Sequence, residues 1–145
     1  MTTQYAVPIS GVTEKQFRRE IAAELRGLAA PPEFFTATAV TFGDEITTDT
    51  GDGAMEGRWL LYEGASTCTL TLPANCTPQA VKFTWYGVGT IAWTAGSGLP
   101  AANIKVVYST DDRIGQQYTS VIVSCVRDSG FAEYLIEGST GPVPA

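Results

Sequence analysis

The chain has 145 residues, which suits one domain with a single hydrophobic core. Its composition is 44% hydrophobic and only 17% charged, and 9 Lys and Arg against 15 Asp and Glu give a net charge of −6. Because nucleic-acid affinity depends on clustered cations, this balance argues against a nucleic-acid partner. The sequence contains no histidine, the commonest general base and metal ligand. We therefore expect a non-enzymatic protein with no catalytic residues, no metal and no cofactor.

No stretch approaches the roughly 20 consecutive apolar residues that a membrane-spanning helix needs. The N-terminus also shows no basic segment followed by an apolar one, so we expect no membrane insertion and synthesis in the cytoplasm. The three cysteines Cys68, Cys76 and Cys125 are an odd number without CxxC spacing. This pattern predicts buried free thiols instead of disulfides or a zinc site.

Residues 1–32 are predicted to form an arm and a short α-helix. The segment 13–16, TEKQ, is typical of a capping box, and Pro31-Pro32 would end the helix. Large apolar residues recur at spacings of four, four and three and form one stripe: Phe17, Ile21, Leu25 and Leu28. A helix of about four turns is not stable alone in water, so the stripe packs on the chain's own β body or on a partner. These four residues are our candidates for oligomerisation and anchoring.

Residues 33–138 change to short runs rich in Thr, Val, Ile and aromatic residues, separated by Gly, Asp and Pro. We expect eight strands, at 35–42, 58–62, 66–72, 81–86, 90–93, 104–108, 118–127 and 132–137. Many short strands in one small domain predict a mainly β fold, a single jelly-roll-like β-sandwich or barrel after the N-terminal helix. Gly87-Val88-Gly89 is typical of a tight hairpin between two strands. Residues 139–145 form a Gly/Pro tail.

Two groups of residues invite a functional interpretation. The acidic segment 44–56 has carboxylates suited to calcium but no known calcium-loop spacing, so we expect a solvated loop. Trp59, Trp85 and Trp93, with Phe83 and Tyr86 beside them, are candidates for carbohydrate contact, because flat aromatic rings stack on sugars. On strands of so small a domain they also suit the core or a subunit interface.

Several segments together resemble a known pattern: CTLTLP at 68–73, VKFTW at 81–85, GVGTIAW at 87–93, AGSG at 95–98 and YLIEG at 134–138. They resemble the small β-domain of tail fibres, spikes and capsid decoration or head-fibre proteins of tailed phages, which are typically trimers. The resemblance covers about residues 40–138. The acidic insertion at 49–56 and the three cysteines depart from the pattern and leave the subfamily open.

The resemblance implies a virion protein that is assembled in the host cytoplasm, forms a homo-oligomer, typically a trimer, and binds capsid or tail proteins. The short chain favours a capsid decoration or head-fibre protein, because receptor-reading fibres usually carry long shafts. The alternative is a tail-fibre or receptor-binding module that contacts a host surface glycan through its surface aromatic residues. No catalytic residues are carried over from the resemblance.

Overall fold

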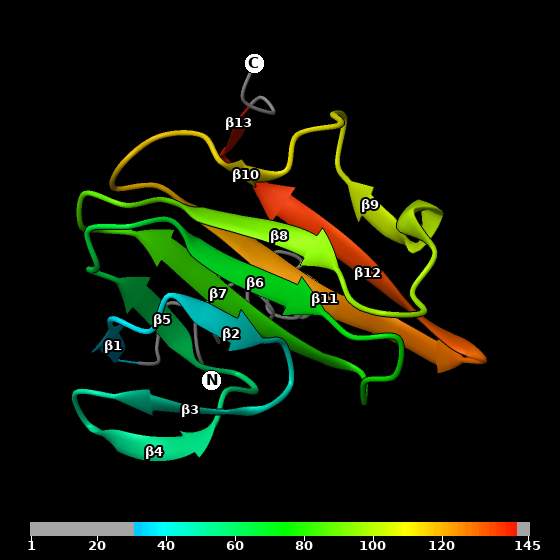
Figure 1. The fold of residues 1–145 in the computed structure, drawn as a ribbon, viewed down its shortest axis with the longest axis horizontal. Coiled ribbons are helices and arrows are strands. Elements are labelled where there is room, and N and C mark those ends of the chain that lie inside the picture. Colours follow the sequence, from blue (N-terminus) through cyan, green and yellow to red (C-terminus); the bar gives the residue numbers. More distant parts are fainter. Residues whose placement is uncertain (1–30, 142–145) are drawn as a thin grey trace, which may run out of the picture. The chain divides into compact units, whose positions relative to one another are not determined.

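The structure is a computed structural model that describes residues 31–141. This part of the chain is mainly β structure, as predicted, and its strands form two larger sheets and a separate two-stranded hairpin (Figure 1). The predicted helix with the stripe Phe17, Ile21, Leu25 and Leu28 lies outside the described residues. Residues 142–145 of the predicted tail lie outside them as well.

Each larger sheet contains strands from both halves of the β body. The six-stranded sheet has the order β1 (Pro32–Phe35), β5 (Trp59–Tyr62), β7 (Gln79–Trp85), β11 (Ser120–Ser129), β12 (Phe131–Gly138) and β9 (Ile104–Val106). The five-stranded sheet has the order β13 (Thr140–Gly141), β10 (Arg113–Ile114), β8 (Ile91–Ala95), β6 (Cys68–Leu72) and β2 (Ala39–Thr41). The hairpin joins β3 (Glu45–Thr48) to β4 (Gly51–Ala54), and a short 3-10 helix, Ala101–Asn103, precedes β9.

The chain passes repeatedly from the six-stranded sheet to the five-stranded sheet, from β1 to β2, from β5 to β6 and from β7 to β8. Strands β1, β5 and β7 pair in parallel in one sheet, and β2, β6 and β8 pair in parallel in the other. This part of the body is therefore wound like three turns of a β-solenoid. Strands β11 and β12 then form a long antiparallel hairpin. The parallel winding differs from the antiparallel strands expected of a jelly roll.

The turns that lead from one sheet to the other stack on one another at residues 36–38, 63–67 and 86–90. The Glu63 N–H donates to the Phe35 carbonyl at 3.0 Å, and the Gly89 N–H donates to the Gly64 carbonyl at 2.9 Å. A Cβ on Gly89 would overlap the Ser66 carbonyl oxygen. The predicted hairpin at Gly87-Val88-Gly89 is therefore wrong, because this segment joins two different sheets. Its two glycines lie too close to the preceding turn to carry side chains.

Two further sequence predictions are corrected. The single strand expected at 35–42 is divided between β1 and β2, which lie in different sheets. The solvated loop expected at 44–56 contains the β3–β4 hairpin, with Asp49 and Thr50 at its tip. The other predicted strands overlap observed strands, and their ends differ by a few residues.

The two larger sheets contribute to one hydrophobic core, and Figure 1 shows β2, β6 and β8 in front of β5, β7 and β11. The alternation expected in CTLTL is observed, because Cys68, Leu70 and Leu72 are buried in this core. Tyr134 joins the sheets: its ring lies 5.7 Å from that of Phe42, and its hydroxyl donates to the Pro73 carbonyl at 2.6 Å.

Candidate functional site

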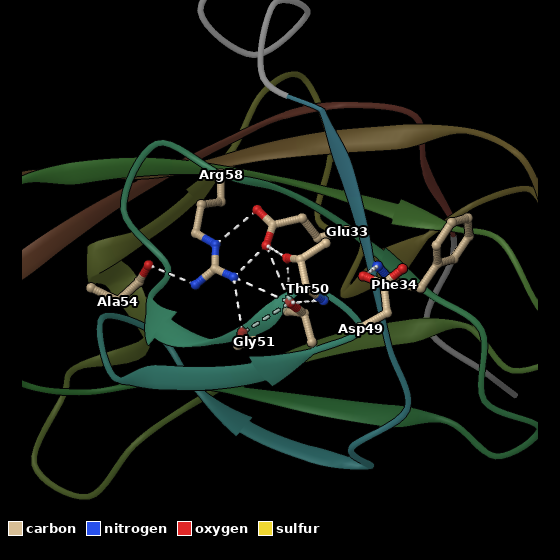
Figure 2. Close-up of polar contacts among 8 residues, drawn as sticks. Glu33, Phe34, Asp49, Thr50, Gly51, Ala54 and Arg58 are labelled. Carbon is tan, nitrogen blue, oxygen red and sulfur yellow. Dashed lines mark hydrogen bonds and ion pairs between the residues drawn. The ribbon is translucent and has the colours of Figure 1, made fainter.

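The acidic hairpin is attached to the six-stranded sheet by a polar network around Glu33 (Figure 2). The Glu33 carboxylate accepts hydrogen bonds from Arg58 Nε at 2.9 Å, from Arg58 Nη2 and from Thr50 Oγ1 at 2.6 Å. Thr48 Oγ1 donates to the same carboxylate at 3.1 Å, and Arg58 Nη1 donates to the Ala54 carbonyl at 3.0 Å. Glu33 lies in β1 and Arg58 directly precedes β5, so the network joins the edge strand β1 and its neighbour β5 to the hairpin.

The ionisation of Glu33 and its pairing with Arg58 indicate a structural role for this network, not a catalytic one. Hydrogen bonding from Arg58 lowers the pKa of Glu33 from its usual 4.5 to about 2, although partial burial opposes the shift. Glu33 therefore stays ionised at physiological pH and has no proton to give as a general acid. The carboxylate and guanidinium satisfy each other, which is how charged groups are accommodated with little contact to water.

Asp49 closes the free edge of β1. The Asp49 N–H donates to the Phe34 carbonyl at 2.9 Å, and the Phe34 N–H donates to Asp49 Oδ1 at 3.0 Å (Figure 2). Because β1 is the outermost strand of its sheet, these backbone groups would otherwise be open to another strand.

Within residues 31–141, no group of three or more acidic or cysteine side chains lies close enough to hold a metal ion.

The thiols Cys68, Cys76 and Cys125 are free and buried, which confirms the prediction from their number and spacing. Burial raises the pKa of Cys68 to about 12 and that of Cys76 to about 11, and it also raises the pKa of Cys125. A thiol with such a pKa is protonated at neutral pH and is a poor nucleophile. These cysteines therefore serve as small hydrophobic residues in the core.

The three tryptophans proposed for carbohydrate contact are not brought together. Trp93 in β8 is only 5% exposed and belongs to the core, and Trp85 packs against the core from β7. Trp59 lies on the opposite face of the six-stranded sheet, where its Nε1 donates to Thr84 Oγ1 at 2.8 Å and Lys82 Nζ lies 4.5 Å from the ring centroid. These residues do not form one flat platform for a sugar.

Aromatic residues gather instead on the face of the six-stranded sheet that points away from the core, and two of them are exposed. The Tyr86 ring lies 5.0 Å from Phe34 and 5.8 Å from Tyr118, in edge-to-face contacts. Tyr86 is 43% exposed and Tyr118 is 68% exposed. We call Phe34, Trp59, Tyr86 and Tyr118 the outer aromatic face.

Sequence analysis named Tyr86 beside the tryptophans but did not predict Tyr118. The alternation Lys82, Thr84, Tyr86 opposite the core residues Val81 and Phe83 was a usable signal for Tyr86. No comparable signal exists for Tyr118, whose backbone has a φ of 69° that non-glycine residues rarely adopt.

The described residues contain no helix that is both long and apolar enough to cross a membrane. Comparisons with protein-family models, with curated proteins and with solved structures found no match to this chain.

Proposed function

We propose that this chain is a non-enzymatic structural protein of a tailed-phage virion. Its two-layered β-sandwich body would form a homotrimer and decorate the capsid as a decoration or head-fibre protein. Capsid proteins would be its partners, after assembly in the host cytoplasm. The observation that supports this proposal best is the outer aromatic face.

The outer aromatic face has the composition of a subunit interface. Tyr and Trp are enriched at interfaces, because they bury a large apolar area and lose little conformational entropy. Tyr118 is held in the left-handed region of backbone conformation with most of its side chain in solvent, an arrangement that needs compensation elsewhere. Contact with another subunit would bury Tyr86 and Tyr118 together.

The chemistry of the β body supports a structural role over catalysis. The sequence has no histidine, the thiols have raised pKa values, and the most strongly perturbed carboxylate, Glu33, is fixed by Arg58. These thiols are thus protonated at neutral pH, and Glu33 is ionised and paired with Arg58.

The test is the solution mass of the full chain, measured by light scattering over a range of concentrations. We expect the mass of a trimer for the natural sequence, and dissociation for the double variant Tyr86→Ser/Tyr118→Ser. The matched control is Tyr108→Ser, because Tyr108 is a fully exposed tyrosine outside the outer aromatic face. A chain lacking residues 1–31 shows whether the arm adds to the association.

A monomeric mass at every concentration would contradict the proposal. A trimer that survives the double substitution unchanged would retain the assembly role but remove the outer aromatic face from it. The second candidate function is a tail-fibre or receptor-binding module that contacts a glycan, and it is favoured by a different surface, the groove beside β9.

A further inference from the structure

A groove of about 430 Å³ lies beside β9, at the edge of the six-stranded sheet. One side is apolar and is formed by Ala95, Ile104 and Val106, which also pack against the core. The other side is polar and includes Ser109, Asp111 and Asp112. The groove therefore has the size and mixed lining typical of a small-molecule site.

The polar side of the groove is held in place by its own hydrogen bonds. Asp111 Oδ2 accepts from Thr140 Oγ1 at 2.8 Å, and the Asp111 N–H donates to Ser109 Oγ at 3.1 Å. Asp112 Oδ1 accepts from Arg113 Nε at 3.3 Å. Among residues 31–141, no hydrogen bond reaches the second carboxylate oxygen of Asp111 or of Asp112. Each carboxylate is thus oriented by one hydrogen bond, and its second oxygen can accept a hydrogen bond from a ligand hydroxyl.

Tyr108 lies beside this groove in the sequence, between the lining residues Val106 and Ser109. Its φ of 59° is in the left-handed region, and its side chain is fully exposed. Such a conformation costs free energy, and an exposed side chain recovers none of it by packing within the chain. Strain of this kind is commonly retained where a residue contacts a ligand.

We propose that this groove binds a sugar residue of a neutral glycan. A pyranose ring presents an apolar C–H face, which suits Ile104 and Val106, and hydroxyl donors, which suit Asp111 and Asp112. Asp112 is paired with Arg113, but no ion pair among residues 31–141 involves Asp111. The Asp111 carboxylate would repel an anionic sugar, so the proposed ligand is neutral. The site is separate from the outer aromatic face, and the proposal does not depend on the oligomeric state.

The test uses the full chain and four probes, the methyl glycosides of glucose, galactose, mannose and N-acetylglucosamine. Binding is followed by saturation-transfer NMR and by titration. We expect saturable binding of at least one glycoside. The dissociation constant should be on the order of 1 mM, because the contact consists of a few hydrogen bonds.

Two neighbouring alanines provide a matched pair of variants. Ala101 and Ala102 are both exposed on the same 3-10 helix, but only Ala101 lines the groove. We expect Ala101→Phe to fill the groove and weaken binding by at least about tenfold, and Ala102→Phe to leave it unchanged. Tyr108→Ala, which removes a fully exposed side chain, should weaken binding without loss of stability and decides the matter if Ala101→Phe does not fold.

Three results would overturn the proposal. Absence of saturable binding for all four glycosides rejects a neutral sugar site. Binding that persists in both Ala101→Phe and Tyr108→Ala places the ligand elsewhere. Tighter binding of spermidine than of any glycoside shows that the carboxylates select cations.

Discussion

Glycine serves different purposes in two connections of the β body. Gly89 lies in a turn between sheets, where an added Cβ would overlap backbone atoms of Ser66 in the turn below. Gly51 follows the tip of the β3–β4 hairpin, has a φ of 126° and has no atom within 4 Å of the position of a Cβ. The first glycine is required by a neighbouring segment, and the second by its own backbone conformation. The stacked turn should therefore be sensitive to added volume, and the hairpin to conformational restriction and to loss of its polar contacts.

The largest effect is expected for Gly89→Ala. The new methyl group would overlap the carbonyl of Ser66, and neither backbone segment can move without disturbing the parallel pairing of β5 and β7. We expect the free energy of unfolding to fall by about 3 kcal/mol. Urea denaturation followed by circular dichroism measures this change. Val88→Ala is the control, because Val88 is exposed in the same turn; similar losses for both variants would mean that the turns are not tightly stacked.

The sequence predicted the strands of the β body better than their arrangement. Alternation such as Cys68, Leu70 and Leu72 reports which face of a strand is buried, and one buried face suffices to predict a strand. It does not report which strand lies beside it. A glycine between two strands suits both a hairpin and a turn between sheets, and here the difference is set by Ser66, which is distant in sequence from Gly89.

The candidate sites were less predictable for a related reason. The acidic segment lacked metal-loop spacing, and its function as an edge closure is visible only once Asp49 lies beside Phe34. The tryptophans were predicted to contact carbohydrate because of their large flat rings, yet Trp93 is buried. Tyr118 is exposed, and its backbone has an unusual positive φ that the sequence does not indicate. Both outcomes depend on tertiary contacts between segments that are far apart in the sequence.

The polar network of the hairpin should make the protein sensitive to acid. The pKa of Glu33 is about 2 in the folded protein and 4.5 ordinarily, so its stabilising contribution is complete above pH 4.5 and is lost as the pH falls towards 2. We expect roughly 2–3 kcal/mol to be lost over this interval from this group. Urea unfolding at several pH values measures it.

Glu33→Gln tests the origin of this acid sensitivity. The variant should be less stable at neutral pH, because Arg58 loses its charged partner, but its stability should change much less between pH 4.5 and 2. Glu45→Gln is the control, since Glu45 is exposed on the same hairpin. If Glu33→Gln retains the full acid dependence, another carboxyl group carries it.

A smaller effect is expected for Gly51→Ala, where only backbone conformation is at stake. A residue with a side chain at a φ of 126° is strained, and we expect a loss of about 1–2 kcal/mol. Thermal unfolding measures it, with Asp52→Ala at the neighbouring exposed position as control. A loss as large as that of Gly89→Ala would remove the distinction between the two glycines.

The smallest effect on stability is expected for Asp49→Ala. The variant removes the acceptor of the Phe34 N–H but keeps the backbone hydrogen bond from Asp49 to the Phe34 carbonyl, so we expect a loss of about 1 kcal/mol. Asp49→Asn, which retains a side-chain oxygen at the same position, should lose less. The exposed N–H at the sheet edge should also promote pairing with other chains.

Light scattering then separates the two consequences of opening the β1 edge. Association that rises with concentration in Asp49→Ala, but not in Asp49→Asn, would show that the hairpin limits strand pairing as well as stabilising the fold. If both variants keep the mass of the natural chain at every concentration, the hydrogen bonds of Asp49 contribute only to stability. The hairpin would then resemble the stacked turn in function, since each would hold its own segment in place and leave assembly to the outer aromatic face.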